Sequence, residues 1–159
     1  MSEHPHPWQV RLFAIAAVIG VGGWLLLLGL WAWWSFQPTN LPTITEPIPV
    51  LNPEHAVAIG TPIVLELAIA KPRDIAPHTS TRFLECTSGN LVTLTATPTQ
   101  LPEGNYTVVS DNVVLPAKVT PGDTCVAVFL NTYEINPIRE ETTRFASEPF
   151  TVLPAAENG

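Results

Sequence analysis

One uncharged stretch limits what this chain can fold into more than any other feature. Residues 12–36, "LFAIAAVIGVGGWLLLLGLWAWWSF", are 25 consecutive residues without a charged side chain. At about 1.5 Å per helical residue, this length exceeds the roughly 20 residues that cross a bilayer. The stretch also lacks the polar face that a soluble core helix shows every 3.6 residues. We therefore predict a transmembrane helix over residues 12–36, preceded by a cytoplasmic stub at residues 1–11.

Tryptophans lie at both ends of this stretch. Trp8 precedes it, and Trp31, Trp33 and Trp34 lie near its end. Amphipathic rings favour the headgroup level, so these residues predict membrane-interface positions in contact with the lipid bilayer. A cleaved signal peptide, the alternative, has a shorter apolar stretch followed by small residues. Because "WWSFQPTN" has bulky rings there, the sequence favours a retained signal-anchor.

The charges that flank the span indicate its orientation. Arg11 immediately precedes it, and the first Lys or Arg after it is Lys71. The positive-inside rule then places the N-terminus in the cytoplasm. We expect a single-pass membrane protein whose C-terminal domain is periplasmic or extracellular.

Small residues give the predicted helix a surface for packing against another helix. Ala16, Gly20 and Gly23 share one helical face, and Ala16 and Gly20 match the small-xxx-small pattern that lets helices approach closely. The alternative is that glycine is simply frequent in membrane helices. The span has no ionisable residue, so it does not form an ion path by itself.

A proline-rich segment separates the span from the rest of the chain. Residues 37–55 carry prolines at positions 38, 42, 47, 49 and 53. Such spacing favours extended polyproline II structure, so we predict a semi-rigid stalk. Alternatively, its later part, "IPVLN", is already an edge strand of the domain that follows.

Residues 56–154 have the pattern of an all-β domain, followed by a flexible tail at residues 155–159. "IVLELAIAK" puts Ile63, Leu65, Leu67 and Ile69 on one face, and "FLECT" and "LVTLTAT" flank an "SGN" turn as in a hairpin. "GNYTVV" and "NVVLPAKV" predict short strands, and "TCVAVFLNTYEI" predicts a central strand. "TTRFASEPFTVL" predicts an edge strand with a break at "SEP". About seven short strands at this spacing favour a β-sandwich.

Two cysteines, Cys86 and Cys125, both fall in the part expected outside the cytoplasm, where disulfides persist. A bridge between them closes a loop of about 40 residues, which the chain-entropy model values at roughly 4 kcal/mol. The alternative is a pair of buried free thiols. Without a paired CxxC motif, a zinc site is not indicated.

The pattern "LPEGNYTV … VTPGDTCVAVFLNTYEI … TRFASEPFTVLP" resembles the second half of an immunoglobulin-like or fibronectin type III-like sandwich. The likeness covers residues 56–153 and implies an immunoglobulin-like β-sandwich of about seven strands after the membrane helix. The sequence departs from true immunoglobulin domains, which have a Trp between the cysteines and a Tyr at the position of Asp123. Cys86 and Cys125 therefore either bridge the two sheets or link neighbouring strands of one sheet.

Chemistry-bearing motifs are sparse. The sequence has no nucleophile elbow, HExxH, P-loop or dinucleotide pattern, so it predicts no catalytic residues, no metal site and no cofactor. Asn105 begins the sequon "NYT" and is a glycosylation candidate in a host that glycosylates. Glu3 and Arg11 cancel, so the net charge of −7 lies after the span and argues against a nucleic-acid partner.

These features favour a non-enzymatic function. The first hypothesis is an accessory protein or subunit of an envelope membrane complex, which docks on a protein partner through its sandwich and its glycine-containing helix face. The alternative is a receptor-like or adhesive module whose loops, at residues 72–81 and 136–141, bind a ligand or a protein outside the cytoplasm.

Overall fold

The computed structural model describes residues 7–95 and 101–155, and this part of the chain forms two compact units. The first unit contains a helix, α1 (Pro7–Ser35), and the turn Asn136–Arg139. The second unit contains the β-strands. The first six residues of the predicted stub and the predicted tail after residue 155 lie outside the described residues.

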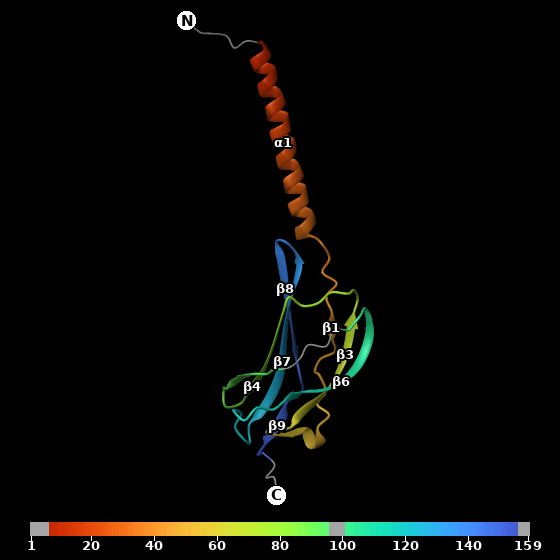
Figure 1. Cartoon of the computed structure of the whole chain (residues 1–159), viewed down its shortest axis with the longest axis vertical. Coiled ribbons are helices and arrows are strands. Elements are labelled where there is room, and N and C mark those ends of the chain that lie inside the picture. The colour runs from red at the N-terminus through yellow and green to blue at the C-terminus, as the bar shows by residue number, and fades with distance from the viewer. Residues whose placement is uncertain (1–6, 96–100, 156–159) are drawn as a thin grey trace. The chain divides into compact units, whose positions relative to one another are not determined.

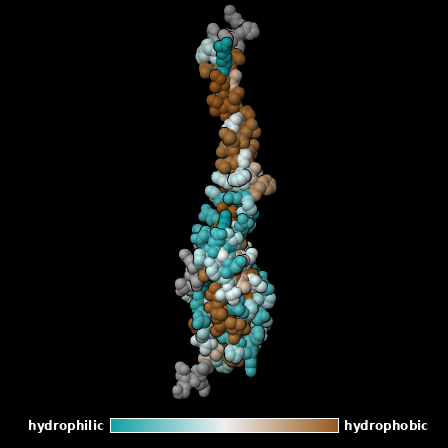
Figure 2. All heavy atoms as spheres, turned by 90° about the vertical axis from the view of Figure 1, so that its right-hand side faces the viewer, coloured by the Kyte–Doolittle hydropathy of each residue, from teal (hydrophilic) through white to brown (hydrophobic). Residues whose placement is uncertain are grey.

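Helix α1 begins at Pro7, five residues before the predicted span, and ends at Ser35. Proline suits the first position of a helix because its missing N–H would have no intrahelical partner there. The segment Trp8–Ser35 is long and apolar enough to cross a membrane, and none of it is buried by the described chain. Figure 2 shows apolar side chains along its length. The helix therefore depends on surroundings outside this chain to cover its surface.

The last turn of α1 is capped within the first unit. The Nδ2 of Asn136 donates to the carbonyl of Trp34 at 2.9 Å, and the Nη1 of Arg139 donates to the carbonyls of Ser35 and Gln37 at 3.1 Å each. Carbonyls at a helix C-terminus lack intrahelical partners, and a cation there interacts favourably with the negative end of the helix dipole. Asn136 and Arg139 therefore stabilise the last turn of α1.

The strands form two sheets (Figure 1). The first is antiparallel and has the order β1 (Thr43–Ile44), β3 (Pro62–Lys71), β6 (Gly104–Val114). The second has the order β2 (Ala56–Ala58), β9 (Phe150–Leu153), β7 (Thr124–Asn136), β4 (Thr79–Cys86), β5 (Leu91–Thr93), and β8 (Arg139–Ala146) also pairs with β7. Strands β2 and β9 pair in parallel. A short 3-10 turn, η1 (Pro53–His55), precedes β2.

The hydrophobic core fills part of the space between the sheets. On β3, Ile63 and Leu65 are fully buried, and they belong to one cluster with Leu84 of β4 and Phe150 of β9. Further along β3, Leu67 is only partly buried. The space between the sheets is therefore less completely filled toward the end of β3.

The β-domain begins earlier than the sequence predicts, because the later part of the proposed stalk packs into it. Ile48 and Val50 have exposed fractions of 0% and 3%. Ile48 forms a bridge to Ser147, and Val50 forms one to Leu65. The neighbouring prolines lack N–H groups, but the Ile48 N–H donates to the carbonyl of Ala146 and the Pro49 carbonyl accepts from Glu66. The alternative of an early edge segment at "IPVLN" is the one that the structure supports.

The described residues form nine strands instead of about seven. The hairpin at "SGN" is present as β4 and β5, with Phe83 opposite Thr93, although residues 96–97 of its predicted second strand lie outside the described part. "GNYTVV" and the start of "NVVLPAKV" form one strand, β6, whose pairing with β3 shifts between Ile63 and Leu65. The "SEP" break separates β8 from β9, and two short strands, β1 and β2, precede β3.

Candidate functional site

A disulfide joins Cys86 and Cys125, as the sequence predicts. These residues lie directly opposite each other on β4 and β7, with a Cα–Cα distance of 4.1 Å. The bridge therefore lies within one sheet and does not cross the sandwich. Asp123, found where immunoglobulin domains have a tyrosine, accepts hydrogen bonds from Ser88 Oγ at 2.6 Å and Thr87 Oγ1 at 3.3 Å. These bonds tie the turn after β4 to the start of β7.

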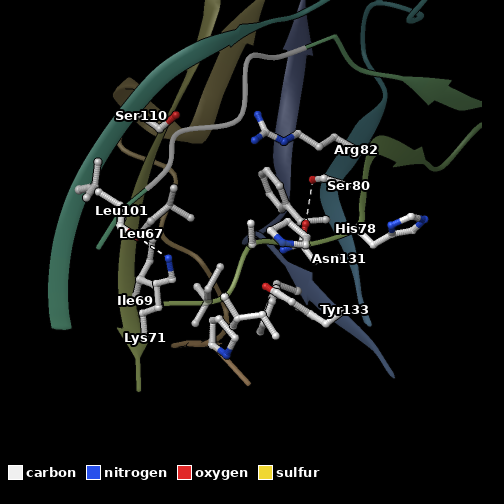
Figure 3. A pocket seen from close by; sticks show the side chains of 18 of the residues that line it. Leu67, Ile69, Lys71, His78, Ser80, Arg82, Leu101, Ser110, Asn131 and Tyr133 are labelled. Carbon is white, nitrogen blue, oxygen red and sulfur yellow. Dashed lines mark hydrogen bonds between the residues drawn. The ribbon is translucent and has the colours of Figure 1, made fainter. Parts of the chain in front are cut away.

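A cavity of about 430 Å³ lies between the two sheets (Figure 3). Its apolar lining comes from both sheets and includes Leu67 and Ile69 of β3, Val108 of β6, Phe129 of β7 and Phe145 of β8. Residues 74–78 of the loop between β3 and β4 also line it. This size falls in the usual range for sites that bind small molecules.

Lys71 lies on the β3 side of the cavity (Figure 3). Its side chain is only 10% exposed. The ammonium donates to Asp74 Oδ1 at 2.7 Å and to the carbonyl of Leu101. These bonds satisfy a charge that would otherwise be costly to bury. The fold thus holds a positive charge at the cavity.

Arg82 lies on the opposite, β4 side (Figure 3). Its guanidinium carbon is 5.7 Å from the centre of the Phe129 ring, a cation–π distance. Burial lowers the pKa of the Arg82 guanidinium from its ordinary value. In residues 7–95 and 101–155, no carboxylate pairs with this guanidinium. Arg82 is therefore a partly desolvated cation without an anionic partner in the described chain.

Neutral polar groups complete the lining. Ser80 Oγ donates to Asn131 Oδ1 at 2.8 Å, and Ser110 Oγ donates to Asn112 Oδ1 at 2.9 Å. Burial raises the pKa of Tyr133, while side-chain hydrogen bonds from Thr143 and Asn131 act in the opposite direction. The arrangement combines apolar walls, the Lys71–Asp74 ion pair, the Arg82 cation and a few neutral polar groups, and it is suited to binding an amphipathic molecule.

The other residues predicted from sequence lie apart from this cavity. Asn105 is exposed on β6. A Cβ added to Gly20 or Gly23 of α1 would meet nothing within 4 Å. Along the helix, Trp8, Trp31 and Trp33 are more than half exposed, and Trp34 is intermediate.

The two predicted ligand loops have different locations. The first, residues 72–81, contributes much of the cavity lining. The turn of the second, Asn136–Arg139, belongs to the unit of α1. Among the described residues, no group of three or more His, Cys, Asp or Glu side chains is arranged to hold a metal ion.

Sequence reasoning did not identify Lys71 and Arg82. The available signal was at Arg82 in "TRFLECT", where the alternation of β4 puts this charged residue on the same face as buried Leu84. A comparison with protein-family models and with curated proteins found no match for this chain.

Proposed function

We propose that this chain is a non-enzymatic, membrane-anchored accessory protein or subunit of an envelope membrane complex. The observation that carries the proposal is the long apolar helix that no described part of the chain buries. In the same chain, a disulfide-bonded β-domain indicates an oxidising compartment. These two features together support a β-domain that the helix anchors to a membrane, outside the cytoplasm.

The charge distribution supports an orientation with the N-terminus in the cytoplasm. Arg11 precedes the apolar segment, and no further Lys or Arg occurs before Lys71. The β-domain then lies in the periplasm or outside the cell. The net charge of −7 disfavours nucleic acid as its partner.

We also propose that the β-domain is an immunoglobulin-like sandwich. The sheet orders β1-β3-β6 and β2-β9-β7-β4-β5 support this, because the N-terminal segment contributes one strand to each sheet. The parallel pairing of β2 with the last strand, β9, is further support. The disulfide within one sheet is a departure from the antibody type, whose bridge joins the two sheets.

The helix face of Ala16, Gly20 and Gly23 is the proposed contact with a partner helix. Small residues let two helix backbones approach closely in a bilayer. A Cβ added at Gly20 meets no non-neighbouring atom of the described chain within 4 Å, so space for a larger side chain is open at this position. A larger side chain at Gly20 is therefore expected to weaken the binding of a partner that packs on this face.

Crosslinking in native membranes, followed by purification of the chain, tests this docking. We expect a protein partner to be crosslinked to the full-length chain and to be lost with Gly20→Leu. Gly29→Leu is the matched control, because Gly29 lies on the opposite side of the helix at 100° per residue and also has nothing within 4 Å of its added Cβ. Equal capture by both variants would argue against docking through this face.

A second candidate function is favoured by the cavity between the sheets. In this proposal the chain is a receptor-like module whose β-domain binds a ligand outside the cytoplasm. The loop at residues 74–78 supports it, and so does Arg82, which no carboxylate of the described residues pairs with. The two candidates make separate predictions, since the first depends on α1 and the second on the cavity.

A further inference from the structure

The cavity between the sheets is lined by a cation, Arg82, that no carboxylate of the described residues balances. Lys71 is paired with Asp74, which is the one acidic residue among the described residues of the lining and has a side chain that is 80% exposed. Arg82 has no such partner among the described residues, and its guanidinium lies against the face of Phe129. The local balance is therefore positive although the whole chain is acidic.

An arginine in this setting fits one kind of anion well. The guanidinium is planar and carries five donors in a fixed fork, which matches the two oxygens of a carboxylate. Partial desolvation strengthens such a pair, because the surrounding dielectric constant is lower than that of water. Phe129 and the polar pair Ser80–Asn131 line the same sheet's side of the cavity.

The remaining walls specify the rest of the ligand. Leu67 and Ile69 of β3 lie across the cavity from the β4 side (Figure 3), and Val108 and Phe145 extend the apolar lining. These side chains offer no donors or acceptors, so the group in contact with them has to be apolar. Such a lining favours a ligand with an apolar body and a single charged end.

We propose that this cavity binds a small amphipathic carboxylate, with its apolar body between Leu67, Ile69 and Phe129 and its carboxylate on the Arg82 guanidinium. The proposal deepens the ligand-binding candidate function and is independent of docking through α1. The ligand supplies the anion that Arg82 lacks, and it covers apolar surface that the core leaves unfilled.

Calorimetric titration of the full-length protein in lipid nanodiscs tests the proposal, with hexanoate as the probe and empty nanodiscs as the blank. Hexanol and hexylammonium have the same apolar body with no charge and with the opposite charge. We expect hexanoate to bind, hexanol to bind at least tenfold more weakly, and hexylammonium not to bind. Equal affinity for hexanol and hexanoate, or no hexanoate binding up to about 10 mM, would overturn the proposal.

The variant Arg82→Gln tests whether Arg82 binds the carboxylate of the ligand. Loss of a charged hydrogen-bond donor is expected to weaken hexanoate binding by roughly tenfold to a hundredfold, with little change for hexanol. Arg144→Gln is the matched control, because Arg144 is half exposed, pairs with Glu85 at 3.2 Å and does not line the cavity. The circular dichroism of each variant checks its folding.

Two results with these variants would contradict the assignment of Arg82. One is unchanged hexanoate affinity in a folded Arg82→Gln protein, and the other is an equal loss in Arg144→Gln. If Arg82→Gln does not fold, Arg82→Lys keeps the charge without the planar fork, and the proposal expects it to bind hexanoate more weakly than the native chain. Crosslinking through α1 is expected to be the same in all of these variants, so failure of the ligand proposal is distinguishable from failure of the docking proposal.

Discussion

At the scale of single residues, the disulfide between Cys86 and Cys125 is expected to stabilise the β-domain. The bridge spans 39 residues of sequence and joins two strands that are already neighbours in the sheet. Its main effect is to restrict the unfolded chain, because the native pairing of β4 with β7 continues over the neighbouring residues.

Replacing both cysteines by serine is therefore expected to lower the free energy of unfolding by about 2–4 kcal/mol without changing the fold. Urea denaturation followed by circular dichroism measures this. Tryptophan fluorescence is unsuitable, because all five tryptophans lie between residues 8 and 34, outside the β-domain. An unchanged midpoint in urea would mean that the bridge does not stabilise the domain.

Single residues also mark what could not be read from the sequence. The disulfide was predictable from two cysteines in strand-like segments, but the sequence left open whether it joins two sheets or two strands. That choice depends on which strands are neighbours, which is a long-range property. The same limit applies to Arg82. Its spacing from Leu84 predicts which face of the strand it lies on, but the sequence does not predict whether a carboxylate lies close enough to pair with it.

At the scale of elements, a serine side chain stabilises the sheet at the break between β8 and β9. Ser147 lies in this break and is only 4% exposed. Its backbone N–H donates to the carbonyl of Ala127 at 2.9 Å, and its Oγ accepts from the Ala127 N–H at 2.9 Å. The serine hydroxyl thus replaces a backbone carbonyl where the ladder is interrupted.

Ser147→Ala is expected to lower the free energy of unfolding by about 1–3 kcal/mol, because the buried N–H of Ala127 loses its acceptor. Urea denaturation measures the change. Thr151→Ala, at an exposed position on β9, is the control and is expected to have a smaller effect. Equal effects of the two substitutions would mean that the hydroxyl of Ser147 does not support the ladder.

The elements themselves were largely predictable, because their signals are local. Apolar length indicates the helix, and alternation with a turn indicates the β4–β5 hairpin. The start of the domain was not predictable from such signals. The spacing of prolines at positions 47 and 49 favours an extended chain whether or not it joins a domain, and only the burial of Ile48 and Val50 distinguishes the two cases.

The whole molecule combines two parts with opposite requirements. Helix α1 needs an apolar environment along its length, whereas the β-domain has its own core and an acidic exterior. The cavity between the sheets is also a property of the assembled domain, because Lys71 and Arg82 come from different sheets. Composition predicts the first contrast, while the cavity depends on how two sheets pack and cannot be found from either strand alone.

The proposed orientation of the chain across a membrane has a direct test through Asn105. Its sequon is the only one in the sequence, and Asn105 and Thr107 are both exposed on β6. If the N-terminus is cytoplasmic, synthesis of the full chain with endoplasmic-reticulum microsomes is expected to add one glycan, which Asn105→Gln removes. The β-domain is then also expected to resist protease added to intact microsomes and to be digested after detergent is added. Digestion in intact microsomes would reverse the proposed orientation, and it would place the disulfide in a compartment that does not favour it.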